Sequence, residues 1–598
     1  MLRASPVPQP TSTPRAWATV VALATAVAFG VKLYISYRSF GTVDVAYWQL
    51  YIMGSHLGSR LYTSEIFNHP PAMLHVLPLI GGLAERSGLP FPFCLRLPGI
   101  IADVGSVWLV WRITQSAAPR LASPAGVLLM AIAPASLMIS GYHGNTDPVM
   151  IFFVLLAVHL RESAAAWAAG IALGMAMNVK VVPLIFAPAL LLYRHELRRG
   201  LALAVAAAAT FLIASMPYLL DDPRFILQRV FGYSPSGSWG IPLLIGLAED
   251  HLRFPALYSE TWSGVPGVME LYAMAVTAAK AYAQWAKFLA LGAIVLAAHR
   301  MNRMDSPPAL FVQCGVAAFL FLFFSPGFGI QYLAWLVPWP VAAGPLVALI
   351  FYAISGEFLY RMYTTNLVWS DATFVSSFAC WLATGLVLVI LCRHAAVAAG
   401  AWASLRQTVG GWHLSTRLAA AAAGLLLLIG FMRASARALA ATPGFLDRTF
   451  VTASSSYGND GAFPPAATVD GRSDVNTWAD RGGWSSAGTP TDDTPEYLTF
   501  MFATDRTIRH ITLYSYPDPE FTLRGFVFQY RTDREWRDIE ATRVRDNFEA
   551  TRWSFEVPRT VSRQIRLLIF GSADRWARVM EVEFSDTETP RAASAIDR

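Results

Sequence analysis

The chain has 598 residues, of which 55% are hydrophobic and only 14% are charged. This composition excludes an ordinary soluble protein with a polar surface and predicts a membrane protein. The formal net charge of +6 comes from arginine, because only four of the basic residues are lysines, and it suits a bacterial inner-membrane protein without implying nucleic acid as a partner.

The amino-terminal segment carries Arg3 and Arg15 ahead of an apolar stretch of about 20 residues. No small-residue cleavage site follows, so the sequence predicts an uncleaved anchor with residues 1–16 in the cytoplasm. The four cysteines all lie in apolar segments, which argues against a disulfide framework and against a zinc site.

Apolar runs recur from residue 17 to residue 432, and their lengths predict about 13 membrane crossings in contact with the lipid bilayer. The predicted crossings lie near residues 17–37, 94–112, 122–140, 149–160, 164–178, 181–193, 201–219, 281–299, 309–324, 331–343, 345–360, 374–392 and 418–432. Basic clusters such as YRHELRRG fall on the cytoplasmic side, as the positive-inside rule requires. The odd number of crossings predicts that a linker at 433–449 and the tail after it lie outside the cytoplasm.

The same assignment of crossings places several polar residues at the outer leaflet. Asp44 in FGTVDVAYWQLY, the loop GYHGNTD at 141–147 and Lys180 all face outward, as do segments at 325–332 and 360–371. Because an ionisable group at membrane depth is costly, this convergence predicts a functional site on the outer face.

Three blocks of sequence carry a resemblance to a group of enzymes. The first runs from Asp44 to NHPP, the second from HGNTDPVMIFF to Lys180, and the third is FGIQYLAWLVPWP. Together they resemble the GT-C superfamily of membrane glycosyltransferases, especially polyprenol-dependent mannosyltransferases. The resemblance covers residues 17–432. It implies a polytopic α-helical GT-C fold and an inverting transfer of a sugar from a polyprenyl-phosphate carrier to an extracytoplasmic glycan or lipid acceptor.

The resemblance also implies roles for single residues. Asp44 is the candidate catalytic base, because an acceptor hydroxyl must lose its proton as it attacks the anomeric carbon. The leaving lipid phosphate needs cationic ligands, and the candidates are Lys180, Arg96 and His143. The residues expected to line the site are Tyr47, Asn145, Gln331, Tyr332 and Arg361. A single acid at position 44, where several members have a pair, leaves open whether Mg²⁺ or Mn²⁺ binds there.

Simpler interpretations of these residues remain open from the sequence alone. Asp147 is a second catalytic candidate, but it stands directly before Pro148, where a helix cap is expected. His69 is another, but the two prolines that follow it favour a structural role. Anchoring at the membrane interface is the alternative for the remaining polar residues, namely Asp44, Tyr47, Arg96, Lys180 and Arg361.

Residues 450–586 alternate apolar and polar side chains between Gly, Pro, Asp and Asn turns, which predicts an antiparallel β-sandwich. The run ASSSYGNDGAFPPAATVDGRSDVNTWAD and the closing VMEVEF resemble the discoidin domain, also called F5/8 type C. This resemblance implies an all-β, jelly-roll-like domain of a kind that often binds carbohydrate. Residues 587–598 are expected to be disordered.

Two aromatic residues of the tail, Tyr457 and Trp484, are the candidates for stacking on sugar rings, whereas Trp478 is expected in the core. Asp470 and Asp474 suit either a structural Ca²⁺ or a turn.

Two functions of different classes fit the whole chain. One is a membrane glycosyltransferase whose tail holds the acceptor glycan. The alternative is a non-catalytic flippase or polysaccharide-assembly protein with a glycan-binding tail. A transporter should carry polar residues through mid-membrane, so the gathering of polar groups at the outer leaflet favours the enzyme.

Overall fold

The structure is a computed structural model of the chain. It describes residues 14–63, 67–116, 124–232, 239–240, 268–364, 371–398, 449–457, 463–473, 478, 483–532 and 535–586. The predicted crossing at 418–432, most of the linker, Asp474 and the segment 587–598 lie outside these residues. Two compact units are present, residues 1–36 with 44–443 and residues 444–598 with 37–43, and each is described by itself.

The first unit is helical in all its described elements. In chain order these are α1 (Pro14–Arg38), α2 (Val43–Gly54), η1 (Ser55–Thr63), α3 (Met73–Ser87), α4 (Phe91–Ser116), α5 (Pro124–Ala131), α6 (Pro134–Met138), η2 (Ile139–His143), α7 (Asp147–Glu162), α8 (Ala166–Val179), η3 (Val182–Phe186), α9 (Ala187–Leu192), η4 (Tyr193–His195), α10 (Leu197–Asp221), α11 (Pro223–Gly232), α15 (Val268–Asn302), α16 (Leu310–Phe324), η5 (Ile330–Trp335), α17 (Pro340–Ala343), α18 (Pro345–Thr364) and α19 (Asp371–Ala398).

Seven spans among the described residues are long and apolar enough to cross a membrane. They are Ala16–Arg38, Phe91–Gln115, Pro124–His143, Leu197–Asp221, Ala281–Asn302, Pro345–Thr364 and Val375–Ala396. A polytopic helical membrane unit is thus confirmed, but the count of about 13 crossings is not.

Two of the predicted crossings are interrupted. The stretch 181–193 divides into η3 and α9, and the stretch 331–343 divides into η5 and α17. Each contains two prolines, which remove backbone donors and break a continuous helix. Both stretches therefore consist of two consecutive short helical elements.

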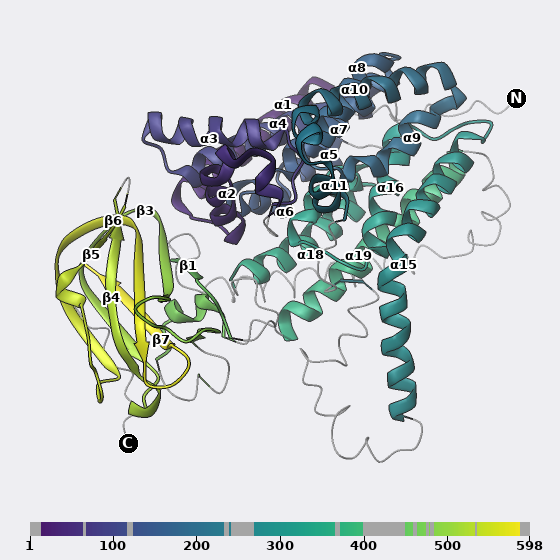
Figure 1. Cartoon of the computed structure of the whole chain (residues 1–598). Coiled ribbons are helices and arrows are strands. Elements are labelled where there is room, and N and C mark those ends of the chain that lie inside the picture. The colour runs from purple at the N-terminus through teal and green to yellow at the C-terminus, as the bar shows by residue number, and fades with distance from the viewer. Residues whose placement is uncertain are drawn as a thin grey trace, which may run out of the picture. The chain divides into compact units, whose positions relative to one another are not determined.

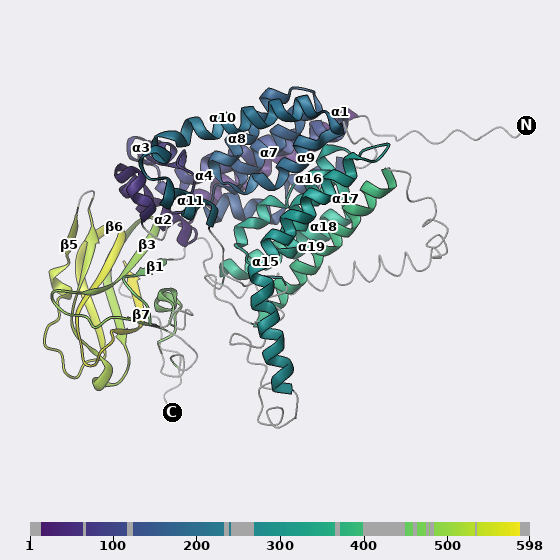
Figure 2. The same ribbon diagram turned by 45° about the vertical axis from the view of Figure 1, so that its right-hand side comes forward.

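Helices α7, α8 and α10 pack closely through small residues. A Cβ on Gly170 would lie 2.4 Å from the Leu203 carbonyl oxygen, and one on Gly174 would lie 2.7 Å from that of Ala207. The α8 and α10 backbones are thus in direct contact, as in small-xxx-small membrane packing. Farther along the chain, α15, α16, α18 and α19 lie side by side in both ribbon views (Figure 1, Figure 2).

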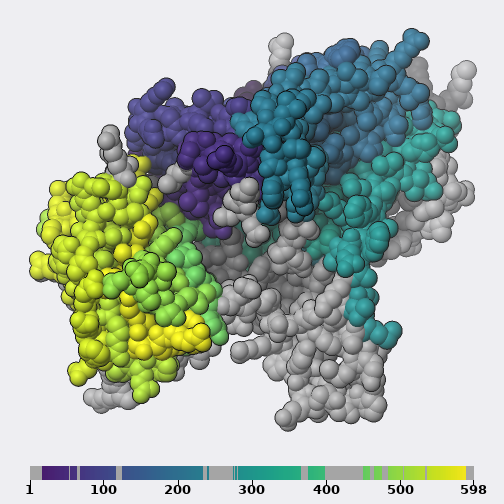
Figure 3. Space-filling model, in the orientation of Figure 1, coloured from purple at the N-terminus to yellow at the C-terminus, as the bar shows by residue number. Residues whose placement is uncertain are grey.

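The segment α10–α11 also packs against the first short helices of the unit. Ser59 of η1 donates a hydrogen bond to Asp221 at the end of α10, and the rings of His75 and Tyr218 are 5.4 Å apart. The space-filling view shows the blue α11 beside the purple amino-terminal helices (Figure 3).

The tail is one curled, all-antiparallel sheet, which confirms the predicted β domain (Figure 1). Its strands are β1 (Phe450–Ala453), β2 (Trp484–Ser485), β3 (Glu496–Ser515), β4 (Leu523–Arg531), β5 (Trp536–Asp538), β6 (Arg552–Ser572) and β7 (Arg578–Ser585). The order is β2-β7-β3-β6-β4-β5, and β1 pairs with β3. The long strands β3 and β6 pair with a register shift between Met501 and Arg506, a bulge that bends both strands.

The curl of the sheet encloses one apolar core. Alternate residues of β3, β4 and β6 point inward, among them Phe500, Phe528 and Leu567, and all three are fully buried. Trp484 belongs to the same core, with no exposed surface. Its indole Nε1 donates to the Ser455 carbonyl oxygen at 2.9 Å.

Candidate active site

Asp44 lies in the first turn of α2, and two side chains hold one of its carboxylate oxygens. Its Oδ2 accepts a hydrogen bond from Asn145 Nδ2 at 2.8 Å and lies 3.0 Å from His143 Nε2. On its other side, His143 Nδ1 lies 2.8 Å from the Tyr363 hydroxyl of α18. The His143 ring therefore lies between the Tyr363 hydroxyl and the Asp44 carboxylate and is within hydrogen-bond distance of both. The Asp44 side chain is 26% exposed, so a substrate can still reach this carboxylate.

A glycine turn after η2 brings the histidine and the asparagine to the acid. Gly144 has φ +80°, in the left-handed region that favours glycine. A Cβ at this position would lie 2.6 Å from Val45 Cγ2. The sequence HGN therefore lets the turn pack against the start of α2, next to Asp44.

Asp147 and Lys180 form a buried ion pair. Lys180 follows α8 in an extended conformation, and its ammonium donates to the two Asp147 oxygens at 2.9 and 2.8 Å. Trp335 Nε1 donates to the same carboxylate at 2.6 Å, and Asp147 has no exposed surface. Asp147 thus bonds to side chains of α8 and η5 instead of capping α7. The Lys180 ammonium is 5.5 Å from the ring centroid of Tyr332.

His69 packs behind this pair. Its ring lies 4.5 Å from that of Trp48, and it hydrogen-bonds the backbone of Val179, the residue before Lys180. Burial first, and the nearby Lys180 charge second, lower the pKa of His69 to about 3. A histidine that stays neutral at ordinary pH suits the structural role better than proton transfer.

The other predicted residues surround the cluster at different depths. Arg96 is 1% exposed and donates from Nη1 to the Ser36 carbonyl oxygen at 3.1 Å, so it is buried and does not snorkel. Tyr47 follows Asp44 by three positions and is exposed. Gln331 is half-buried in η5. Arg361 pairs with Glu357 on its own helix, α18.

The surroundings of Asp44 keep it ionised. Burial alone would raise the pKa of Asp44, but His143, Lys180 and Asn145 act in the opposite direction, and the net effect is a lowered pKa. An ionised carboxylate at neutral pH is the form that a general base needs.

The loops of the tail gather aromatic side chains on either side of Tyr457. Tyr457 is exposed, and its ring lies 5.2 Å from that of Trp576 in an edge-to-face arrangement. Phe463 stacks on Trp478 at 4.6 Å. The Arg578 guanidinium lies 5.7 Å from the Trp576 ring centroid. This cluster presents an aromatic surface with a cation beside it.

Comparison with protein families then assigns the two units. Residues 67–326 match the family model of glycosyltransferase family 87, and residues 450–583 match that of the F5/8 type C domain. The helical unit thus contains a region that is similar to glycosyltransferase family 87. The first match supports a membrane glycosyltransferase, and its range contains His69, His143 and Lys180 but not Asp44 or Tyr363.

The search of curated proteins gives no match. Solved structures similar to the chain cover its F5/8 type C region. A pectin-binding carbohydrate-binding module is 19% identical with a TM-score of 0.20, over 24% of this chain and 96% of that one. A family 32 module in complex with 4,5-unsaturated mannuronic acid is 22% identical with a TM-score of 0.19, over 23% and 95%. A family 32 module from C. perfringens in complex with galactose is 12% identical with a TM-score of 0.18, over 23% and 92%.

The metal-ion expectations find little support in the described residues. No group of three or more His, Cys, Asp or Glu side chains in them is arranged to hold an ion. Near the family 87 site, Asp147 is already neutralised by Lys180, which leaves Asp44 as the accessible carboxylate of the cluster. The side chains around Asp44 therefore do not fit a binding site for a divalent cation.

Three residues that the sequence did not single out belong to these sites. Tyr363 contacts His143, Trp335 contacts Asp147, and Trp576 contacts Tyr457. Tyr363 lies in the segment 360–371, which the sequence predicts to face outward, and Trp335 lies in the third sequence block. Their neighbours in the sequence therefore already pointed to the site. Trp484 was a candidate for stacking on a sugar, but its complete burial leaves no face for a ligand.

Proposed function

We propose that the family 87 region is an inverting glycosyltransferase that uses a polyprenyl-phosphate-linked sugar. The acceptor would be a glycan or lipid on the outer face of a bacterial inner membrane, with the N-terminus cytoplasmic and the tail extracytoplasmic. The observation that carries the proposal is the partly exposed Asp44 carboxylate, whose Oδ2 is held by Asn145 at 2.8 Å and by His143 at 3.0 Å.

In this reaction Asp44 is the general base. The oxygen of an acceptor hydroxyl attacks the anomeric carbon of the donor, and its proton moves to the Asp44 carboxylate as the new bond forms. The bond from that carbon to the phosphate oxygen breaks, and the phosphate leaves with the electron pair. Attack from the face opposite the phosphate inverts the anomeric centre. His143 and Asn145 occupy Oδ2, so Oδ1 is the oxygen that we assign to the proton.

Lys180 is the proposed partner of the donor phosphate. The Lys180 side chain is 16% exposed, and its ammonium is already paired with Asp147, which holds it in place before substrate binds. A preorganised cation next to a leaving phosphate stabilises the charge that develops in the transition state. Arg96 and His143, which the sequence also suggested for this role, lie deeper, and we assign them to supporting the turn and the base.

The test is Asp44→Asn in the purified full-length protein, assayed with a panel of radiolabelled polyprenyl-phosphate sugars and cell-envelope acceptors. The substitution keeps the size of the side chain and removes the proton acceptor, so kcat should fall by about 100-fold or more, with donor binding retained. The control is Asp305→Asn, an exposed acid between α15 and α16. Transfer at the wild-type rate by Asp44→Asn would refute the assignment. Donor binding without transfer by the wild type would favour the flippase alternative.

A further inference from the structure

A second buried ion pair joins two long apolar helices of the membrane unit, α1 and α4. Lys32 of α1 and Asp103 of α4 are 2.5 Å apart, and their side chains are 5% and 16% exposed. Both residues lie within predicted spans, at Ala16–Arg38 and Phe91–Gln115. A charge at such a depth is costly and marks a functional site by default.

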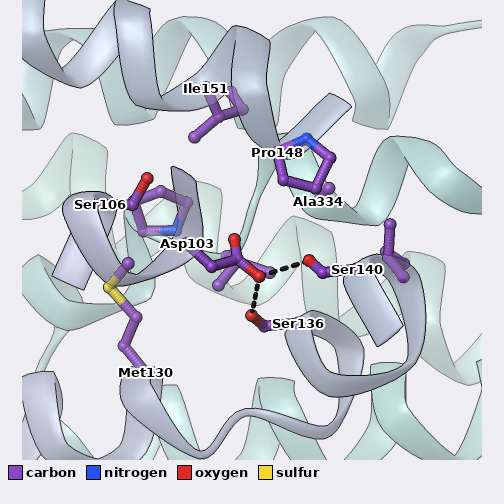
Figure 4. Close-up of a pocket in the computed structure, with 11 residues that line it drawn as sticks. Asp103, Ser106, Met130, Ser136, Ser140, Pro148, Ile151 and Ala334 are labelled. Carbon is purple, nitrogen blue, oxygen red and sulfur yellow. Dashed lines mark hydrogen bonds between the residues drawn. The ribbon is translucent and has the colours of Figure 1, made fainter. Parts of the chain in front are cut away.

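A single oxygen of Asp103 gathers three donors. Its Oδ2 accepts from Lys32 Nζ, from Ser136 Oγ at 2.8 Å and from Ser140 Oγ. Lys32 also donates to Ser136 Oγ at 2.7 Å. Figure 4 shows the two serines turned toward the carboxylate from neighbouring turns of one helical segment. The ion pair therefore fastens α6 and η2 to α1 and α4 at once.

The same segment rests directly on α1. A Cβ on Gly141 would lie 3.3 Å from Lys32 Cα, so the η2 backbone packs against the helix at the very residue that forms the pair. His143 follows Ser140 by three residues and Asn145 follows it by five. The rigid η2 segment thus links the anchor at Asp103 to the two side chains that hold Asp44.

We propose that Lys32 and Asp103 are positioning residues for the candidate base. By fixing Ser136 and Ser140, they hold η2 against α1, so that His143 and Asn145 reach Oδ2 of Asp44. This inference rests on the proposed function, because it assigns the pair to the same reaction. It requires that a loosened η2 slow the chemical step while the donor still binds, since displacement of a catalytic group by about 1 Å costs about 100-fold in rate.

The cavity beside the pair supplies a matched control. It has a volume of about 10 Å³, and its lining includes Asp103, Ser106, Ser136 and Ser140. Ser106 Oγ is buried and has no hydrogen-bond partner among the described residues. Ser106→Ala therefore removes a hydroxyl from the same cavity as Ser140→Ala does, but leaves the anchor of η2 intact.

The experiment compares Ser140→Ala, Asp103→Asn and the uncharged Lys32→Met/Asp103→Asn double variant with Ser106→Ala and wild type. Each protein is purified in full length and measured twice: kcat and KM for transfer, and amide hydrogen exchange of the peptide covering 139–147. The three anchor variants should lose about 10-fold or more in kcat with little change in donor KM, and exchange in that peptide should rise. Ser106→Ala should match wild type in both measurements.

Either of two results would overturn the proposal. One is a wild-type kcat in Ser140→Ala and in the double variant. The other is a lowered kcat without faster exchange at 139–147, which would separate the pair from the position of η2. Asp103→Asn leaves Lys32 without its partner and can prevent folding, in which case the other two variants decide. A wild type that transfers no sugar would refute the proposed function itself, whereas the exchange measurement would still report whether the pair holds η2.

Discussion

At the scale of single residues, the site separates its two acids by environment. Asp44 is partly exposed and contacts His143 and Asn145, whereas Asp147 is fully buried and neutralised by Lys180. An acid that must accept a proton needs access and a free oxygen, and Asp44 alone has both. Asp147 instead fixes the cation that we assign to the donor phosphate.

Breaking the Asp147–Lys180 pair should cost more than removing it whole. Lys180→Ala leaves Asp147 charged and buried, which should lower the free energy of unfolding by about 3–5 kcal/mol. The double variant Lys180→Met/Asp147→Leu leaves no buried charge, and it should recover most of that loss while remaining unable to bind donor tightly. Thermal unfolding in detergent and donor-binding measurements check both parts. Equal destabilisation of the single and double variants would contradict this account.

His69 should make stability depend on pH. The pKa of His69 is about 3 in the folded protein and about 6.5 in the unfolded chain. Below pH 6.5 the unfolded state gains a proton that the folded state does not bind, so stability falls by about 1.4 kcal/mol per pH unit as the pH drops toward 3. Above pH 6.5 this contribution is fully present.

The measurement is thermal unfolding at pH 7.5 and pH 5 for wild type, His69→Gln and the control His75→Gln, whose side chain is exposed. From pH 7.5 to pH 5, wild type and the control should lose about 2 kcal/mol more than His69→Gln does. Parallel pH curves for all three proteins would show that His69 is not the group responsible.

At the scale of elements, the position of Lys180 depends on how α8 packs. Lys180 is the residue that ends α8, and α8 contacts α10 through Gly170 and Gly174. A side chain at either glycine must push the two helices apart. Such a shift would move Lys180 away from Asp147, although neither glycine touches the site.

Gly174→Ala tests this dependence. The new Cβ would lie 2.6 Å from Thr210 Cβ and 2.7 Å from the Ala207 carbonyl oxygen, so both stability and donor binding should fall, by roughly 1–3 kcal/mol in stability. Gly30→Ala is the control, because a Cβ at Gly30 in α1 has nothing within 4 Å. Equal unfolding temperatures of Gly174→Ala and Gly30→Ala would show that the close contact of α8 with α10 does not require glycine at position 174.

The sequence predicted helices and strands wherever their hydrophobic pattern was strong. Long apolar runs gave the membrane helices, and period-two alternation gave the strands of the tail. Short crossings such as 181–193 stay predictions, because the apolar helical stretch there is shorter than a full membrane span. Trp484 failed because a single tryptophan in a turn-rich stretch carries no sign of which way it faces, and pairing of β2 with β7 turns it inward.

The site was predictable in part for the same reason. Orientation by positive charges brought Asp44, the 141–147 loop and Lys180 to one side of the membrane. Their pairing was not predictable: His143 was assigned to the donor phosphate, yet its ring contacts Asp44. A buried histidine bonds to the group that lies within about 3 Å of its ring nitrogens. Local turns such as the one at Gly144 set that distance, and it cannot be inferred from spacing along the chain.

At the scale of the whole molecule, the chain joins a helical unit that matches the glycosyltransferase family 87 model to a β domain that matches the F5/8 type C model. The tail has its own core and the candidate site lies wholly in the helical unit, so binding and chemistry should be separable. We therefore expect the tail to raise the effective concentration of acceptor glycan near the enzyme without contributing to the chemical step.

Deletion of 446–598 should accordingly leave transfer to a short acceptor intact and weaken use of long glycans. Tyr457→Ala and Trp576→Ala in the full chain should reproduce the weakening, because each loses a stacking surface. Trp536→Ala, in β5 under the Arg566 guanidinium, is the matched control. Kinetics with acceptors of graded length provide the measurement, and equal loss with short and long acceptors would place the tail in the active site itself.

The Lys32–Asp103 pair has a consequence for biogenesis. Helix α1 brings a lysine into the membrane during synthesis, and its partner arrives only with α4, 71 positions later. A lone charge opposes insertion by about 2.5–3.5 kcal/mol at the centre of a membrane helix, and by less at a position such as Lys32 that lies nearer the end of its span. During that interval α1 partitions poorly into the lipid, and it should remain beside the insertion machinery until α4 emerges. The two helices should then leave for the bilayer together, so that α1 and α4 form the first tertiary contact of the nascent protein.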